Sequence, residues 1–262
     1  MSDAKPVRLE RSGAVASLIL DRPERRNPIN AEAHALLREA LDSIADDPGV
    51  RALVLTGAGG YFCSGQDLAE RYGMLAEGEV DLEASLRENY NPLIRRLLAL
   101  PFPVIAAVEG IAAGAGLGLL LAADIVLAGR STRFQLPFSR VGLGPDSGLS
   151  WTLARQVGAN RAMALLLTGE RFDAEQAERW GVVWRVMDDG DSAGEAEALA
   201  ARLAKGPRLA LAETRRRVHE AASFDIEEAL DGEAAMQGKL GLHPDYRTAV
   251  NAFMEKREPE FE

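Results

Sequence analysis

The stretch FPVIAAVEGIAAGAG, residues 102–116, decides the fold of this chain. It holds an apolar run from Val104 to Val108 that leads directly into a glycine-rich loop. RALVLTGAGGYFCSG, residues 51–65, repeats the arrangement with an apolar run from Ala52 to Thr56. Helical stretches separate the two. Apolar strands that alternate with helices predict βαβ units around a buried parallel sheet.

The segments around these two runs extend the pattern. VRLERSGAVASLIL, residues 7–20, predicts a hairpin turning at Ser12 and Gly13. Asn30 is a good N-cap for a helix with apolar residues at helical spacing. Further strands are expected in DIVLAG and GVVWRV, which start at positions 124 and 181.

The remainder of the chain, from about Asp191, is helical in pattern. Asp225 and Glu228 have the spacing of a capping box. A last helix is expected from Asp245 through Phe253. The predicted layout is therefore an α/β core followed by a helical C-terminal part.

Composition limits the function classes. The 262 residues carry a net charge of −10, which argues against a nucleic-acid binder because such a protein needs a basic face. Cys63 is the only cysteine, so the chain has no internal disulfide and no cysteine-rich metal site. The first residues lack the apolar core of a signal peptide, and no run is long enough to span a bilayer. We expect a cytoplasmic enzyme or binding protein with no membrane partner.

The two glycine loops exclude the common phosphate-binding motifs. In a G-x-G-x-x-G reading the last position is Phe62 or Leu119, and neither loop holds Gly-Lys-Ser/Thr. If the strands are neighbours, one main-chain N–H from each loop can converge on a carbonyl oxygen and form an oxyanion hole. Alternatively, the glycines only permit tight turns and close packing.

Taken together, the loops resemble the crotonase (enoyl-CoA hydratase/isomerase) family. The segments RPERRNPIN, YFCSGQDL, VEGIAAGAGLGLLLAADIVLA and FDAEQAERWGVVWRVMDD carry the resemblance. It implies an α/β crotonase-like (ClpP/crotonase) spiral of ββα units over residues 1–200 and a helical trimerisation part over residues 201–262. It also implies an acyl-CoA thioester substrate, a homotrimer or dimer of trimers, and no cofactor beyond the coenzyme A of the substrate.

The resemblance assigns roles to particular residues. It places the oxyanion donors at the main-chain N–H groups of Ser64 and Ala115. The remaining candidates are expected to contact coenzyme A or the acyl group, and they are Arg25, Arg26, Gln66, Asp67, Leu68, Phe138, Phe253 and Lys256. Several have simpler alternatives, since the arginines and Lys256 are also typical solvated charges and Asp67 is a good helix cap.

The departures from the family pattern are informative. A hydratase of this family uses two glutamates to hold and activate water, and the matching positions here are Gly118 and Phe138. Neither side chain transfers a proton, so hydration is disfavoured.

Asp146 stands where some family members carry a single catalytic carboxylate. The stretches YNPLIRRL, GPDSG and DYRTAVNAFMEKREPEF resemble the isomerases that act on 1,2-epoxyphenylacetyl-CoA in phenylacetate breakdown. The predicted reaction is isomerisation through a thioester enolate, on that substrate or between Δ3- and Δ2-enoyl-CoA. Asp146 can instead cap a helix, and a cap at a helix N-terminus opposes the effect of burial on its pKa. The sequence leaves the sign of that shift open.

Other functions stay open at this stage. They are hydration through another group, hydrolytic dehalogenation of an aryl-CoA, and acyl-CoA binding without catalysis. Dehalogenation is disfavoured because Asn91 occupies the position of the required histidine. Cys63 is expected to be a packing residue, and the three histidines are expected to be solvated or locally hydrogen-bonded.

Overall fold

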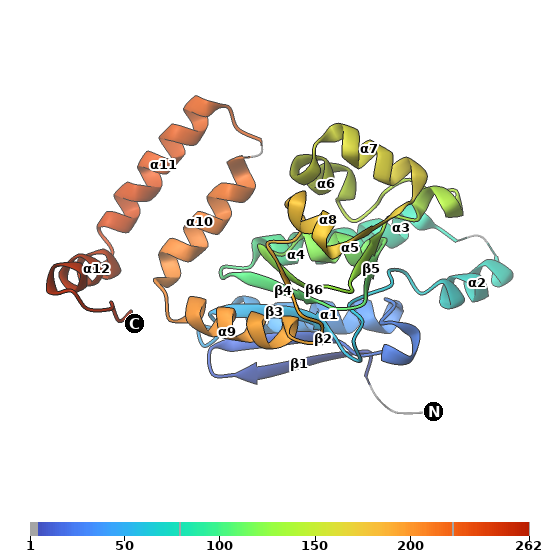
Figure 1. The fold of residues 1–262 in the computed structure, drawn as a ribbon, viewed down its shortest axis with the longest axis horizontal. Helices are drawn as coiled ribbons and strands as arrows, with labels where there is room; N and C mark the ends of the chain where they lie inside the picture. Colours follow the sequence, from blue (N-terminus) through green and yellow to red (C-terminus); the bar gives the residue numbers. More distant parts are fainter. Residues whose placement is uncertain (1–4, 79, 222, 262) are drawn as a thin grey trace.

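The computed structural model describes residues 5–78, 80–221 and 223–261 and contains two sheets (Figure 1). In the larger sheet β1 and β2 are antiparallel, and the remaining strands run parallel to β2. The order across this sheet is β1 (Val7–Ser12), β2 (Val15–Leu20), β3 (Ala52–Gly57), β4 (Val104–Val108), β6 (Ile125–Gly129) and β9 (Arg185–Met187). The smaller sheet has the order β5 (Ile111–Ala113), β7 (Arg133–Gln135) and β8 (Arg171–Asp173).

The two strands that end in glycine loops are neighbours in the sheet, as the sequence predicts. Leu53 of β3 is opposite Val104 of β4, and Leu55 is opposite Ala106. All four side chains are buried. Because parallel strands end at the same edge of a sheet, the loops that follow them start side by side.

The chain winds between the two sheets. β4 and β6 lie in the larger sheet, and each leads into a short strand of the smaller sheet, β5 or β7. β5 is followed by α5 (Ala115–Leu121), and β7 by a 3₁₀ turn (Phe138–Val141) and α6 (Leu149–Val157). This repeat of two strands and a helix is the spiral that the resemblance implies.

Helices cover both faces of the larger sheet. α9 (Ser192–Ala204) packs on one face, where its Ala196 and Leu199 join Val54 of β3 and Ile105 of β4 in a small buried cluster. The main core lies on the other face. The other helices that precede α10 and are not yet named are α1 (Ala31–Ala45), α2 (Leu68–Glu77), α3 (Leu82–Ser85), α4 (Asn91–Ala99), α7 (Ala159–Thr168) and α8 (Ala174–Arg179).

The last three helices form an arm that extends away from the core (Figure 1). They are α10 (Arg208–Ala221), α11 (Ile226–Gly241) and α12 (Pro244–Glu255). Buried Arg215 fixes α10 to the core, since it donates to Asp124 and to the carbonyls of Leu97, Leu98 and Leu100 at the end of α4. Across the part of the chain that the structure describes, no helix is both long and apolar enough to cross a membrane.

The predicted caps are confirmed, and several element boundaries are corrected. The strand expected from position 124 begins at Ile125, and the last helix extends beyond Phe253 to Glu255. Asn30 caps α1, and the capping box of Asp225 and Glu228 begins α11. The strand expected from position 181 begins only at Arg185. The last helix begins at Pro244, one residue earlier than predicted, because His243 supplies the cap.

Candidate active site

The two glycine loops are joined by main-chain hydrogen bonds. The N–H of Cys63 donates to the carbonyl of Ile111 at 3.0 Å, and the N–H of Ala113 donates to the carbonyl of Cys63 at 2.9 Å. Gly65 lies so close to the second loop that a Cβ atom there would be 2.8 Å from the carbonyl oxygen of Ala113 and 3.6 Å from the nitrogen of Ala115. Gly65 also has a φ of 94°, so only glycine fits this point of contact.

The structure corrects the predicted donor in the first loop. The N–H of Ser64 donates to the carbonyl of Arg26 at 3.0 Å and is therefore not available to a ligand. Gln66, two residues later, is placed differently. Ile29 forms hydrogen bonds with the two neighbours of Gln66. Its N–H donates to the carbonyl of Gly65 at 2.8 Å, and its carbonyl accepts from the N–H of Asp67 at 2.9 Å. The N–H of Gln66 therefore points away from Ile29 and has no acceptor among residues 5–78, 80–221 and 223–261.

The second loop offers the N–H of Ala115. Ala115 is the first residue of α5, and the first N–H groups of a helix have no partner within it. The N–H of the preceding Gly114 donates to Gln135 at 3.0 Å, whereas the N–H of Ala115 has no acceptor within the described chain. Two free main-chain donors, on Gln66 and Ala115, thus lie on either side of the contact at Gly65.

Asp146 does not cap a helix. The N-cap of α6 is Gly148, and no side chain bonds to the first turn. The carboxylate instead accepts a 2.9 Å hydrogen bond from the hydroxyl of Ser147. Burial raises the pKa of Asp146 above its ordinary value, and the bond from Ser147 opposes this only in part. The pKa of Asp146, whose direction of shift the sequence leaves open, is therefore shifted upward, because desolvation disfavours the charged carboxylate.

Two neighbours relate Asp146 to the loops that carry the free N–H groups. Ser147, which follows it, packs against Gly118, three residues after Ala115 on α5. The charge of Asp146 also raises the pKa of Tyr90, after burial as the main cause. The hydroxyl of Tyr90 donates to Oε1 of Gln66. Asp146 is therefore linked to α5 through Ser147 and to the first loop through Tyr90.

The positions of the two missing glutamates hold no polar side chain. Gly118 is buried in α5, and Phe138 is 6% exposed and belongs to the main core. Neither supplies a group that could hold a water molecule beside Asp146.

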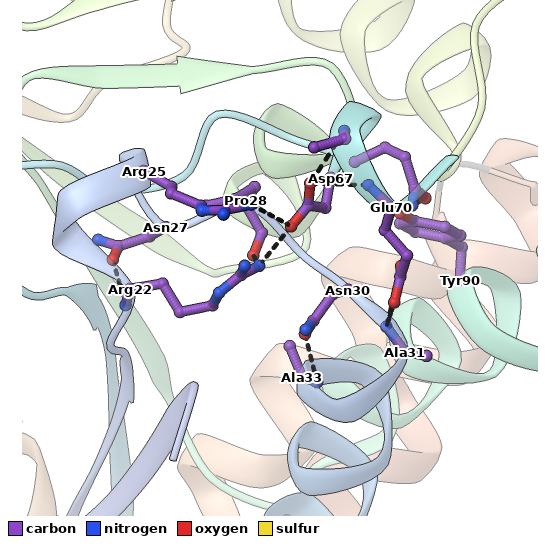
Figure 2. A network of polar contacts seen from close by, with 12 residues as sticks. Arg22, Arg25, Asn27, Pro28, Asn30, Ala31, Ala33, Asp67, Glu70 and Tyr90 are labelled. Carbon is purple, nitrogen blue, oxygen red and sulfur yellow. Dashed lines mark hydrogen bonds and ion pairs between the residues drawn. The ribbon is translucent and has the colours of Figure 1, made fainter. Parts of the chain in front are cut away.

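Asp67 has a structural role, because its carboxylate connects the start of α2 to Arg22 (Figure 2). It caps α2 by accepting from the N–H groups of Ala69 and Glu70, and it pairs with Arg22 at 2.7 Å. Burial alone would raise its pKa, but the hydrogen bond from Arg22 and those from the main chain outweigh burial and lower it. The alternative role of Asp67 as a cap is therefore confirmed. Arg22 was not among the predicted residues, and only its position at the start of RPERRNPIN hinted at a role.

The other predicted residues of this region are exposed to different degrees. Arg25 lies 4.0 Å from the carboxylate of Asp67 and is more than half exposed. The guanidinium of Arg26 lies 5.7 Å from the ring centre of Tyr61. Leu68 is 62% exposed. The arrangement leaves both arginines accessible to a charged ligand, and their contact with coenzyme A stays a prediction.

Phe253 and Lys256 lie on the arm, at the far end of α12 (Figure 1). The side chain of Phe253 is 81% exposed. Within one chain they are not brought to the glycine loops, so they could contact a substrate only in a neighbouring subunit.

Cys63 is buried, as expected of a packing residue. Desolvation raises the pKa of its thiol to about 12, so it is not a nucleophile at neutral pH.

The prediction that the three histidines are solvated or locally hydrogen-bonded is wrong for one of them. His219 contacts Asp124 at 3.1 Å, and His243 accepts from the N–H of Asp245. His34 is instead buried, and neither ring nitrogen has a hydrogen-bond partner in the described chain. Its ring packs edge to face against the ring of Tyr90, and the two ring centres are 4.2 Å apart.

The chain is similar to known proteins over nearly its whole length. A family model described as "Enoyl-CoA hydratase/isomerase" matches residues 10–262. The chain is 46% identical over 247 residues to the 1,2-epoxyphenylacetyl-CoA isomerase of Escherichia coli, covering 94% of each. It is 45% identical over 255 residues to a probable enoyl-CoA hydratase of Rhodobacter capsulatus, covering 97% of each. The structure of a putative enoyl-CoA hydratase/isomerase from Mycobacterium abscessus superposes with a TM-score of 0.94 at 40% identity, over 98% of this chain and 99% of that one.

Proposed function

This chain is an enzyme of the enoyl-CoA hydratase/isomerase family, and from that premise we propose that it isomerises acyl-CoA thioesters. The proposed substrates are 1,2-epoxyphenylacetyl-CoA, which the Escherichia coli relative is named for, and 3-enoyl-CoA esters. The observation that supports the proposal is one partly buried carboxylate, Asp146, whose pKa is raised, together with two free main-chain donors in the glycine loops and no second acid–base group at Gly118 or Phe138.

The donors would bind the thioester carbonyl. In this proposal the N–H groups of Gln66 and Ala115 donate to its oxygen and stabilise the negative charge that develops there. One such donor is worth about 3 kcal/mol in a transition state. The same polarisation acidifies the carbon next to the carbonyl.

Asp146 would then move a single proton. Its carboxylate removes the proton from carbon, and the electron pair of that bond passes to the thioester oxygen as an enolate. The acid returns the proton to a different carbon, which shifts the double bond. No water is consumed, so one acid–base group is sufficient. The raised pKa of Asp146 suits it to both halves of this transfer.

The remaining predicted residues would hold the substrate. Arg25 and Arg26 are proposed to meet the phosphates of coenzyme A, and Gln66 and Leu68 its pantetheine and adenine. An aromatic acyl group would lie beside Phe138. Asp67 would contribute through the position of its loop, because its carboxylate is already bound to Arg22.

We propose that the protein assembles as a trimer or a dimer of trimers. The arm carries large apolar side chains that are mostly exposed in one chain, among them Leu242 at 90% and Met254 at 74%. Burial of such side chains favours association. In this arrangement residues 201–262 form the oligomerisation region, and Phe253 and Lys256 reach the substrate of a neighbouring subunit. A cytoplasmic location belongs to the same proposal.

A panel of CoA thioesters tests the proposal. The wild-type protein and Asp146→Asn would be incubated with 3-enoyl-, 2-enoyl-, epoxyphenylacetyl- and chlorobenzoyl-CoA. Products would be followed by mass and by NMR. Isomerisation leaves the mass unchanged, hydration adds one water, and dehalogenation releases chloride.

We expect isomerisation of the 3-enoyl or epoxide ester by the wild type. In Asp146→Asn, turnover should fall by about 10²- to 10⁴-fold while CoA-ester binding is kept. Hydration as the main reaction would favour the activity named for the Rhodobacter capsulatus relative. Binding of all four esters with no turnover would identify a non-catalytic binding protein.

A further inference from the structure

We propose that Ser147 is a positioning residue for Asp146, holding one carboxylate oxygen and leaving the other for proton transfer. The inference rests on the proposed function, in which Asp146 moves the proton. The hydroxyl of Ser147 donates to Oδ1 of Asp146 at 2.9 Å. Within the described residues this is the only hydrogen bond of the carboxylate, so Oδ2 is the oxygen that remains for the substrate.

The backbone at Ser147 is strained, which indicates that its side chain is used. Its φ is 51°, in the left-handed region that disfavours every residue with a Cβ atom. Glycine would adopt this conformation without strain. Strained non-glycine residues persist where the surrounding structure fixes them, commonly at functional sites. At 3% exposure, the Ser147 side chain is fixed by packing.

Gly118 provides the space that Ser147 occupies. A Cβ atom built on Gly118 would lie 2.4 Å from the Cβ of Ser147, 3.0 Å from its carbonyl oxygen and 3.4 Å from its hydroxyl oxygen. Any side chain at position 118 would therefore displace Ser147 from Asp146. Gly118 stands where the resemblance places a hydratase glutamate. A side chain at position 118 and the hydrogen bond from Ser147 to Asp146 therefore exclude each other, and we call this relation the exchange between positions 118 and 147.

The surroundings of Asp146 make the effect of this hydrogen bond measurable. Burial favours the protonated carboxyl, and the hydroxyl of Ser147 favours the carboxylate. The titratable side chain that responds to Asp146 is Tyr90, which is buried and held protonated, and Cys63 and Arg71 adjoin Tyr90 in turn. Removing the Ser147 hydroxyl leaves burial unopposed.

The first experiment titrates Asp146 directly. The carboxyl band of Asp146 would be followed against pH by isotope-edited infrared spectroscopy, and Asp146→Asn would assign it. The test variants are Ser147→Ala, which keeps the Cβ, and Ser147→Gly, which also relieves the strain. The exposed Ser150→Ala is the control.

We expect Asp146 to titrate at higher pH in both Ser147 variants and unchanged in the control. The acid limb of kcat/KM for isomerisation should move to higher pH in the same direction, and kcat should fall by about 10-fold with little change in KM. An unchanged titration of Asp146 would overturn the inference. A shifted titration in a protein that isomerises no CoA ester would instead overturn the proposed function and leave the coupling of the pair intact.

The second experiment tests the exchange between positions 118 and 147. Gly118→Ala should lower the melting temperature of the parent protein, because the new methyl group meets Ser147. In a Ser147→Gly background the same change should cost less, because the 2.4 Å contact with the Cβ is gone and only the carbonyl oxygen of residue 147, 3.0 Å away, remains close. An equal drop in both backgrounds would show that Ser147 does not fill this space, and would overturn the exchange.

Discussion

Ala115→Pro would remove one oxyanion donor without removing a hydrogen bond of the fold. Ala115 is the first residue of α5, where proline is tolerated because its fixed φ suits the helix and the missing N–H makes no helical bond. The preceding Gly114 has φ 51° and ψ −126°, outside the helical region that proline disfavours for its predecessor. The Cδ of the proline ring would take the place of the amide hydrogen.

The expected magnitude follows from that geometry. Loss of one donor costs about 3 kcal/mol of transition-state stabilisation, so kcat should fall by about 10²- to 10³-fold. KM should rise as well, because the Cδ of the proline lies where the carbonyl oxygen would bind, so the fall in kcat is the measure of the lost donor. The free energy of unfolding should stay within about 1 kcal/mol of the parent value, since no hydrogen bond is lost.

The assay is steady-state isomerisation together with urea denaturation of the same preparations. Ala159→Pro is a matched control, because Ala159 is the exposed first residue of α7 and also follows a glycine with positive φ, Gly158. A folded Ala115→Pro protein with a kcat near the parent value would refute the role of this N–H. An equal loss in Ala159→Pro would attribute the effect to the proline itself.

Three further predictions concern the surroundings of the site. Tyr90→Phe removes the hydroxyl that donates to Gln66, and we expect kcat to fall about 5-fold, as for one hydrogen bond of ~1 kcal/mol; an unchanged kcat would show that other contacts hold this loop. Arg215→Ala leaves the buried carbonyls of Leu97 and Leu100 without their donor, so urea denaturation should show a loss of about 2–6 kcal/mol, and a loss below about 1 kcal/mol would contradict the anchoring role. Desolvation and then the charges of nearby arginines lower the pKa of His34 to about 4, below the unfolded value near 6.5. The unfolded state therefore binds the proton first, and stability should fall by up to about 3 kcal/mol as pH drops from 6.5 to 4, with no loss from this group above pH 6.5. His34→Leu should abolish that dependence, and denaturation curves with the same pH slope in both proteins would argue against it.

Side-chain chemistry could be read from the sequence where it depends on local pattern. Asn30 and the pair Asp225 and Glu228 were recognisable as caps because a cap bonds to N–H groups two or three residues ahead. The same local rule gave a cap as the alternative role of Asp146, and this alternative is wrong because the turn places Gly148 rather than the aspartate at the head of α6.

Burial and partners that are distant in sequence could not be predicted from such local patterns. Asp67 had two readings until its partner Arg22, 45 residues away in sequence, was located. His34 was predicted to be solvated or locally hydrogen-bonded, because the sequence around it does not indicate that the ring of Tyr90 packs against it.

The sequence by itself determined the architecture and the class of enzyme. Buried parallel strands require continuous apolar runs, and loops in close contact require glycine, so both leave a readable pattern at positions 52–65 and 104–118. Tertiary structure alone decided which main-chain N–H is free, because Ser64 loses its N–H to a carbonyl on a distant loop while Gln66 keeps its own. It also decided the direction of the Asp146 pKa, because desolvation depends on what surrounds a carboxylate rather than on what precedes it in the chain.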